Sequence, residues 1–195
     1  MSVSISFDIG YYVSTFGVMI VSLVFQYGSN MWSKRLNSPC RLNDGAERVD
    51  IACTVNKFEL VFDIWSKTNC CAAADITPGM GRTIWGVLYE IPEDLIDRHK
   101  SGSRKSLDEI EGECTNYKRV TIDVILPDGS RKSRVWTYIG KDRKKWIQTS
   151  CEYVKYIMCG LRENNVPEDY EDYVEYVKRQ IISNNPGLES QINEL

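Results

Sequence analysis

The clearest pattern along the chain is an apolar run that ends abruptly in small polar residues. Residues Val18 to Phe25 carry no charge and lead into Tyr27-Gly28-Ser29-Asn30. An uncharged, apolar run that stops at a turn signal is typical of a buried strand. Gly28 tolerates backbone angles that other residues resist, and Ser29 and Asn30 favour turns and helix starts. The turn is either an ordinary loop or a concave set of backbone N–H groups that suits an anion such as a carboxylate.

The rest of the pattern predicts short strands first and helices afterwards. Alternating or continuous apolar positions predict strands at 49–53, 58–64, 83–91, 117–126 and 133–139. The last two should form a hairpin across Pro127-Asp128-Gly129-Ser130. Amphipathic helices are predicted at 152–164 and 167–182. Strands without long helices between them favour an α+β fold with a curved or closed sheet over a parallel doubly wound one.

A short acidic helix is predicted from Ser106 to Glu111. Ser106 can cap it, Glu109 lies three residues further on as in a capping box, and Gly112 can end it. Such an acidic run is usually a solvated surface. Glu111, however, stands at the helix end just before an apolar strand, and a carboxylate in that place can face a pocket.

Composition narrows the functional classes. The 195 residues suffice for one domain with a real core, and the net charge of -3 argues against general nucleic-acid binding. The seven cysteines are odd in number and form no C-x-x-C pair, and the chain has a single histidine, His99. Disulfide scaffolds and zinc sites need paired spacings. We therefore expect reduced thiols in a cytoplasmic protein without metal or cofactor.

The two ends of the chain are less clearly patterned than its middle. Residues 1–18 are interpreted as an N-terminal leader of uncertain role, 19–182 as the folded domain and 183–195 as a loose tail. Residues 9–25 hold 17 consecutive uncharged residues. A membrane anchor remains an alternative for them, but spanning a bilayer normally takes about 20 apolar residues. A signal peptide is disfavoured because no basic residue precedes Lys34.

Two separated segments together resemble a known family. The segment before and through the turn is similar to the tyrosine-phenylalanine-x-tyrosine-glycine-serine-asparagine motif of the gamma-glutamylcyclotransferase family; it reads Val24-Phe25-Gln26-Tyr27-Gly28-Ser29-Asn30-Met31. Leu107-Asp108-x-x-Glu111-Gly112, followed by Tyr117, resembles the catalytic segment of that family. The likeness runs in order over about residues 19–175. Neither motif is specific by itself, whereas the combination is.

The resemblance implies a small mixed β-barrel flanked by helices, with a pocket for a gamma-glutamyl group. The implied reaction is intramolecular: the substrate's α-amine attacks its own γ-carbonyl, closes 5-oxoproline and releases an amino acid. Glu111 is the implied general base, which takes the amine proton and returns it to the leaving nitrogen. The implied substrate-binding residues, with Tyr138 as a hydroxyl donor, are Val24, Phe25, Gln26, Tyr27, Gly28, Ser29, Asn30 and Tyr138.

Three departures from the family pattern leave alternatives open. Residues 99–105 look like an insertion before the catalytic helix, Gln26 takes a position that is commonly small, and Val24 replaces a usual tyrosine. These changes bear on the rim of the pocket and hence on the leaving group. The alternatives are removal of a gamma-glutamyl group from an amine or a protected biosynthetic intermediate, and a binding module without turnover. A homodimer is also possible.

Overall fold

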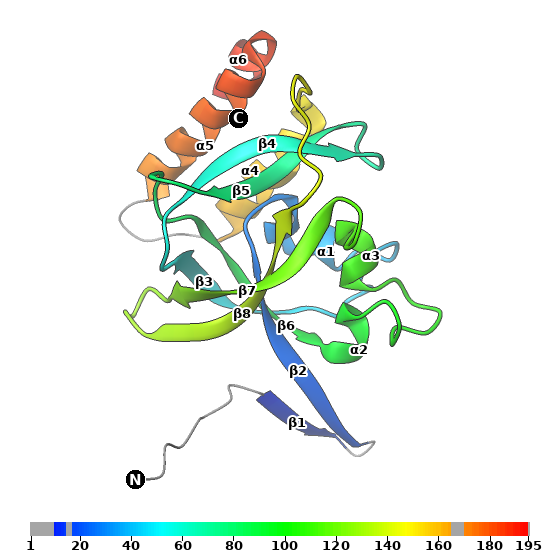
Figure 1. Ribbon diagram of the computed structural model, residues 1–195. Coiled ribbons are helices and arrows are strands. Elements are labelled where there is room, and N and C mark those ends of the chain that lie inside the picture. The colour runs from blue at the N-terminus through cyan, green and yellow to red at the C-terminus, as the bar shows by residue number, and fades with distance from the viewer. Residues whose placement is uncertain (1–9, 15–16, 165–169, 195) are drawn as a thin grey trace.

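A closed barrel of five strands forms the centre of the computed structural model, which describes residues 10–14, 17–164 and 170–194 (Figure 1). Its strands, in spatial order, are β2 (Gly17–Gln26), β6 (Trp85–Pro92), β3 (Glu47–Thr54), β7 (Tyr117–Ile125) and β8 (Arg131–Gly140). Neighbours pair antiparallel, except that β8 returns beside β2 in parallel at Val24 and Trp136 and closes the ring. The predicted α+β fold with a closed, mixed barrel is confirmed.

The N-terminal half of β2 extends beyond the barrel. There it pairs antiparallel with β1 (Gly10–Ser14), so the two strands project from the barrel as a hairpin (Figure 1). Part of the predicted leader therefore forms a strand, while residues 1–9 and 15–16 lie outside the described residues. Across the described chain, every helix is too short or too polar to span a bilayer.

A two-stranded ribbon and the C-terminal helices cover the other end of the barrel. The ribbon consists of β4 (Phe58–Ser66) and β5 (Cys71–Pro78), and α5 (Tyr170–Asn184) packs on β4. The prediction of a loose tail is wrong: η2 (Pro186–Leu188) and α6 (Glu189–Asn193) follow α5, and Ile192 is fully buried. Ile192 lies in a mostly polar segment, so the sequence there shows no periodic pattern of apolar residues that would predict a helix.

Three short helices and one long one flank the barrel. They are α1 (Ser33–Leu36), α2 (Glu93–Ile96), α3 (Leu107–Glu111) and α4 (Cys151–Glu163). The predicted capping box of α3 is present: the Ser106 side chain accepts from the Glu109 N–H, and the Glu109 side chain accepts from the Ser106 N–H. Gly112 ends α3 in the left-handed conformation, with φ of 67°. These local signals fix where Glu111 leaves the helix.

Gly86 in β6 lies where two strands approach closely. A Cβ added at Gly86 would lie 2.4 Å from the carbonyl oxygen of Gln26 and 2.6 Å from the ring of Phe25. Any larger residue would push β6 away from the end of β2. The place where β2 turns into the following loop thus depends on a residue without a side chain.

A buried carboxylate ties the ribbon to the barrel. Asp75 on β5 is fully buried, accepts from the Gly140 N–H at 2.6 Å and pairs with Arg143 at 2.9 Å. Asp63 on β4 shares this arginine at 3.6 Å. Desolvation, followed by repulsion from Asp75, raises the pKa of Asp63 to about 6.

This shift predicts a pH-dependent effect of Asp63→Asn on stability. An unfolded aspartate has a pKa of about 3.9, so the folded state binds more protons between about pH 4 and pH 6, and the free energy of unfolding falls as pH rises through that window. Asparagine cannot ionise, and one pKa unit corresponds to about 1.4 kcal/mol, so the variant should gain about 2 kcal/mol, or roughly 4–8 °C in Tm, at pH 7 relative to its effect at pH 4. Thermal unfolding across pH tests this; a Tm difference independent of pH would contradict it.

Candidate active site

The turn after β2 forms one wall of a small cavity. Residues Ser29–Met31 form the 3-10 helix η1, closed by a bond of 3.0 Å from the Met31 N–H to the Gly28 carbonyl. α4 packs closely on this turn, since a Cβ added at Gly160 would lie 2.7 Å from the Cβ of Met31. The turn is therefore held between the barrel and a long helix. It is not a solvated loop.

The cavity collects most of the predicted site residues. It has a volume of about 30 Å³. Its wall comes from the β2 turn, β5, α3, β7, β8 and α4, through Gln26, Tyr27, Gly28, Ser29, Asn30, Ala74, Glu111, Tyr117, Tyr138 and Tyr153. Val24 and Phe25, also predicted, are absent from this wall and lie in the core with no exposed surface. They position the turn by packing.

Glu111 meets the turn directly. The side-chain amide of Asn30 donates to Glu111 Oε1 at 2.6 Å, joining residues 81 positions apart in the chain. Desolvation raises the pKa of Glu111, and the charge of Arg41 and the Asn30 hydrogen bond oppose the rise. A carboxylate with a raised pKa and an ordered donor on one oxygen has its second oxygen available for a proton.

Two of the four tyrosines that line the cavity use their hydroxyls to hold its walls together. The Tyr27 hydroxyl donates to the carbonyl of Tyr138 at 2.6 Å, and the Tyr117 hydroxyl donates to the carbonyl of Ala74 at 2.7 Å. Burial raises the pKa of both well above the usual value, so both remain neutral. These hydroxyls join β2 to β8 and β7 to β5, which fixes the width of the cavity.

The other two tyrosines differ in where their protons point. Tyr138 donates to Asp108 Oδ1 at 2.8 Å, and Arg119 holds both oxygens of the same carboxylate at 3.2 Å. Tyr138 thus lines the cavity, as predicted, but its proton is directed to Asp108. Tyr153 accepts from the Ala74 N–H at 3.1 Å, so its own proton can serve another acceptor. In the sequence, Tyr153 is marked only as a residue of the amphipathic helix predicted at 152–164.

Gln26 presents a donor that makes no hydrogen bond of normal geometry but acts weakly on Glu111. The residue is only 6% exposed and lines the cavity, and its Nε2 makes no hydrogen bond to any described residue. It lies beside Glu111 and lowers the pKa of that carboxyl. A buried amide N–H without a hydrogen-bond partner lowers the stability of the fold, unless a ligand accepts the hydrogen bond. The departure from a small residue at position 26 therefore adds a polar contact inside the cavity.

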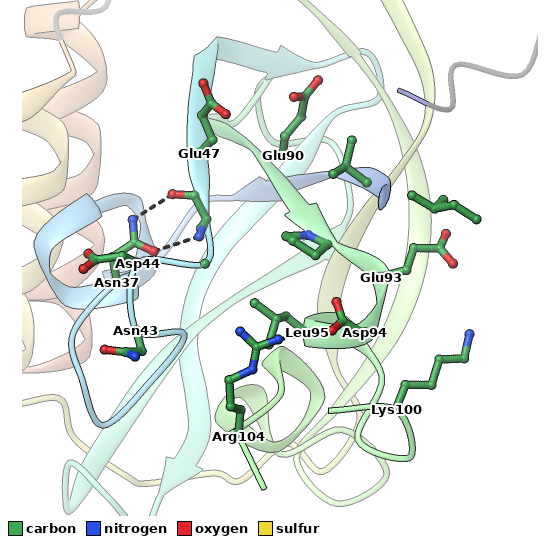
Figure 2. A pocket seen from close by; sticks show the side chains of 15 residues that line it. Asn37, Asn43, Asp44, Glu47, Glu90, Glu93, Asp94, Leu95, Lys100 and Arg104 are labelled. Carbon is green, nitrogen blue, oxygen red and sulfur yellow. Dashed lines mark hydrogen bonds and ion pairs between the residues drawn. The ribbon is translucent and has the colours of Figure 1, made fainter. Parts of the chain in front are cut away.

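A larger cavity lies elsewhere. It is an open groove of about 1200 Å³ between the loop before β3 and the end of β6, and Figure 2 shows the side chains that line it. Acidic side chains, among them Glu47, Glu90 and Asp94, face Lys100 and Arg104, and Arg104 pairs with Asp94 at 3.1 Å. No predicted site residue lines it. Lys100 and Arg104 of the predicted insertion at 99–105 thus line this groove. Neither residue lines the cavity at Glu111.

Removing the hydroxyl of Tyr138 should cost stability. Tyr138→Phe leaves buried Asp108 without one donor, and we expect the free energy of unfolding to fall by about 1–2 kcal/mol. Urea denaturation measures the change. Tyr156→Phe is the matched control, because Tyr156 bonds only to Glu152 in an exposed pair and should change stability little. Equal stability of the Tyr138 variant and the parent would show that Asp108 does not depend on this bond.

Comparison with known proteins gives one family and several solved structures. A family model described as gamma-glutamyl cyclotransferase, AIG2-like, matches residues 24–155. No curated protein gives a significant match. An uncharacterized protein from Homo sapiens, loc79017, is 25% identical in sequence. Its crystal structure matches with a TM-score of 0.65, and the match covers 78% of this chain and 85% of that one.

Two further structures share the fold at lower identity. One named gamma-glutamyl cyclotransferase is 24% identical, with a TM-score of 0.63 over 78% of this chain and 85% of its own. YkqA from Bacillus subtilis is 23% identical, with a TM-score of 0.65; the match covers 84% of this chain but only 55% of YkqA. The barrel and its flanking helices are thus a shared architecture.

Proposed function

Because the chain belongs to the AIG2-like gamma-glutamyl cyclotransferase family, we propose that it cyclises the gamma-glutamyl group of a gamma-glutamyl amino acid to 5-oxoproline and releases the free amino acid. The observation that carries the proposal is the hydrogen bond between Asn30 and Glu111. It brings the only acid of the cavity wall into contact with the turn that has the family motif. We also infer a cytoplasmic location from the unpaired cysteine spacings.

In this proposal the turn binds the substrate and Glu111 handles its proton. Backbone groups of Tyr27 to Asn30 hold the α-carboxylate or the γ-carbonyl oxygen, and the chain of the substrate folds back so that its α-nitrogen reaches the γ-carbon. Most of the catalytic advantage comes from holding this conformer, because closure of a five-membered ring is then an intramolecular step. The raised pKa of Glu111 suits a base that works near neutral pH.

The bond changes balance without a cofactor. The α-ammonium gives one proton to Glu111, and the free amine forms a C–N bond to the γ-carbon, leaving negative charge on the former carbonyl oxygen. The old amide C–N bond then breaks as Glu111 returns the proton to the leaving nitrogen. The ring nitrogen, which still carries two hydrogens, gives one of them through Glu111 to the released amine, which leaves as an ammonium. The products are 5-oxoproline and the amino acid. The Tyr153 hydroxyl is the donor we assign to the oxyanion, because the Tyr138 proton is directed to Asp108.

The direct test is incubation of the pure protein with gamma-glutamyl-alanine and detection of 5-oxoproline by mass spectrometry. A panel with other amino acids, amines and protected intermediates as leaving groups defines the substrate class. Failure of every gamma-glutamyl compound to yield 5-oxoproline would refute the proposal. Calorimetric binding of 5-oxoproline without turnover would then identify a binding module.

Glu111→Gln should remove turnover and keep the fold. Losing a general base costs about 10²–10⁴-fold in rate. The matched control is Glu109→Gln on the same helix, because glutamine also completes a capping box and residue 109 is absent from the cavity wall. Steady-state kinetics and circular dichroism measure both. A Glu111 variant that keeps parental kcat would place the base elsewhere.

Gln26→Met tests the role of this amide donor. Methionine has a similar length without an N–H, so the variant should bind the substrate less tightly and raise KM roughly tenfold, as expected for loss of a hydrogen bond to a charged group. The thermal stability should change little, since Nε2 loses no hydrogen bond of normal geometry. An unchanged KM would show that the amide does not contact the substrate.

A further inference from the structure

Arg41 lies directly behind the residue that holds Glu111. Its Nη2 donates to Asn30 Oδ1 at 2.6 Å, while the amide nitrogen of the same Asn30 donates to Glu111 Oε1 at 2.6 Å. Arg41 does not itself line the cavity. An amide has one acceptor end and one donor end, so these two contacts fix its orientation and align guanidinium, amide and carboxylate in series.

The surroundings of Glu111 make Arg41 its main counter-charge. The cations that act on its carboxylate are Arg41 and, more weakly, Arg35, both from the segment after η1. The other titratable groups around it are the neutral tyrosines of β2, β7, β8 and α4, namely Tyr27, Tyr117, Tyr138 and Tyr153. Asp108, on the same helix, is engaged by Tyr138 and Arg119.

Arg41 in turn has Glu111 as its main favourable charge. Burial lowers the pKa of Arg41, and Glu111 is the strongest influence opposing that fall. Its Nε is buried without a hydrogen-bond partner among the described residues. A buried guanidinium with an unsatisfied N–H is unfavourable for stability alone. A role in holding the charge of Glu111 accounts for its place.

We propose that Arg41 is a positioning residue for the cyclisation, which acts through Asn30 to keep Glu111 ionised and oriented toward the cavity before the substrate arrives. The proposal rests on the proposed function of Glu111. The position of the Asn30 amide between the Arg41 guanidinium and the Glu111 carboxylate sets how strongly the two charges interact. A direct ion pair would stabilise the carboxylate so strongly that it became a poor base, whereas no cation would leave it protonated by desolvation. The relay gives an ionised group that still accepts a proton.

The test compares Arg41→Met and Arg41→Gln, which remove the charge, with Arg41→Lys, which keeps it. We expect the acid limb of the kcat/KM profile to move about one pH unit upward in the first two variants and to stay near the parent in the third. The substrate amine titrates identically in all of them, so the difference reports the enzyme. Arg104→Met is the control for net charge, because Arg104 pairs with Asp94 at the surface and should shift nothing.

A carbon-13 NMR titration of the Glu111 carboxyl, assigned with Glu111→Gln, gives the same answer without turnover. It separates failure of this proposal from failure of the proposed function: if no gamma-glutamyl compound reacts, the titration still reports whether Arg41 sets the charge of Glu111. An unchanged titration in Arg41→Gln, with or without lower stability, would overturn the proposal. If Arg41→Met does not fold, the titration of Arg41→Gln is the deciding measurement, because glutamine can retain a donor toward Asn30.

Discussion

Placing a carboxylate in a desolvated cavity beside the barrel is the constraint on which the rest of this structure depends. Desolvation disfavours the charged form of Glu111, and a few contacts offset it, among them the amide of Asn30, the charge of Arg41 and the side chain of Gln26. Each contact must hold its position closely. The capping box and Gly112 fix the end of α3, and packing of α4 on η1 fixes the turn. The architecture keeps two short segments at hydrogen-bond distance.

Local features of the site were readable from the sequence because local rules determine them. The apolar run into Gly28, the Ser106–Glu109 box and the end of α3 at Gly112 each depend on residues within a few positions of one another. The α+β fold with a curved or closed sheet followed from the strand pattern, and the mixed barrel followed from the family resemblance. The pairing of the turn with Glu111 came from that resemblance alone, since no periodicity links residues 81 positions apart.

The sequence does not show which hydrogen-bond partner each of several similar side chains takes. Four tyrosines line the cavity, and nothing local says that Tyr138 serves Asp108 while Tyr153 keeps its proton available. Arg41 lies in a polar stretch with Pro39 and looks like any loop arginine. Its role depends on how α1 returns the chain behind Asn30. The C-terminal tail fails for a similar reason, because burial of Ile192 is decided by the helices it meets.

The parallel pairing of β2 with β8 has a consequence for how the protein reaches its native state. The seam joins Val24 to Trp136, so the ring cannot close until most of the chain is available, and such long-range pairing slows folding. During synthesis, the edge of the apolar β2 that faces away from β6 therefore stays unpaired until β8 emerges from the ribosome. Shielding that strand is the step at which a chaperone would most increase the yield of folded protein.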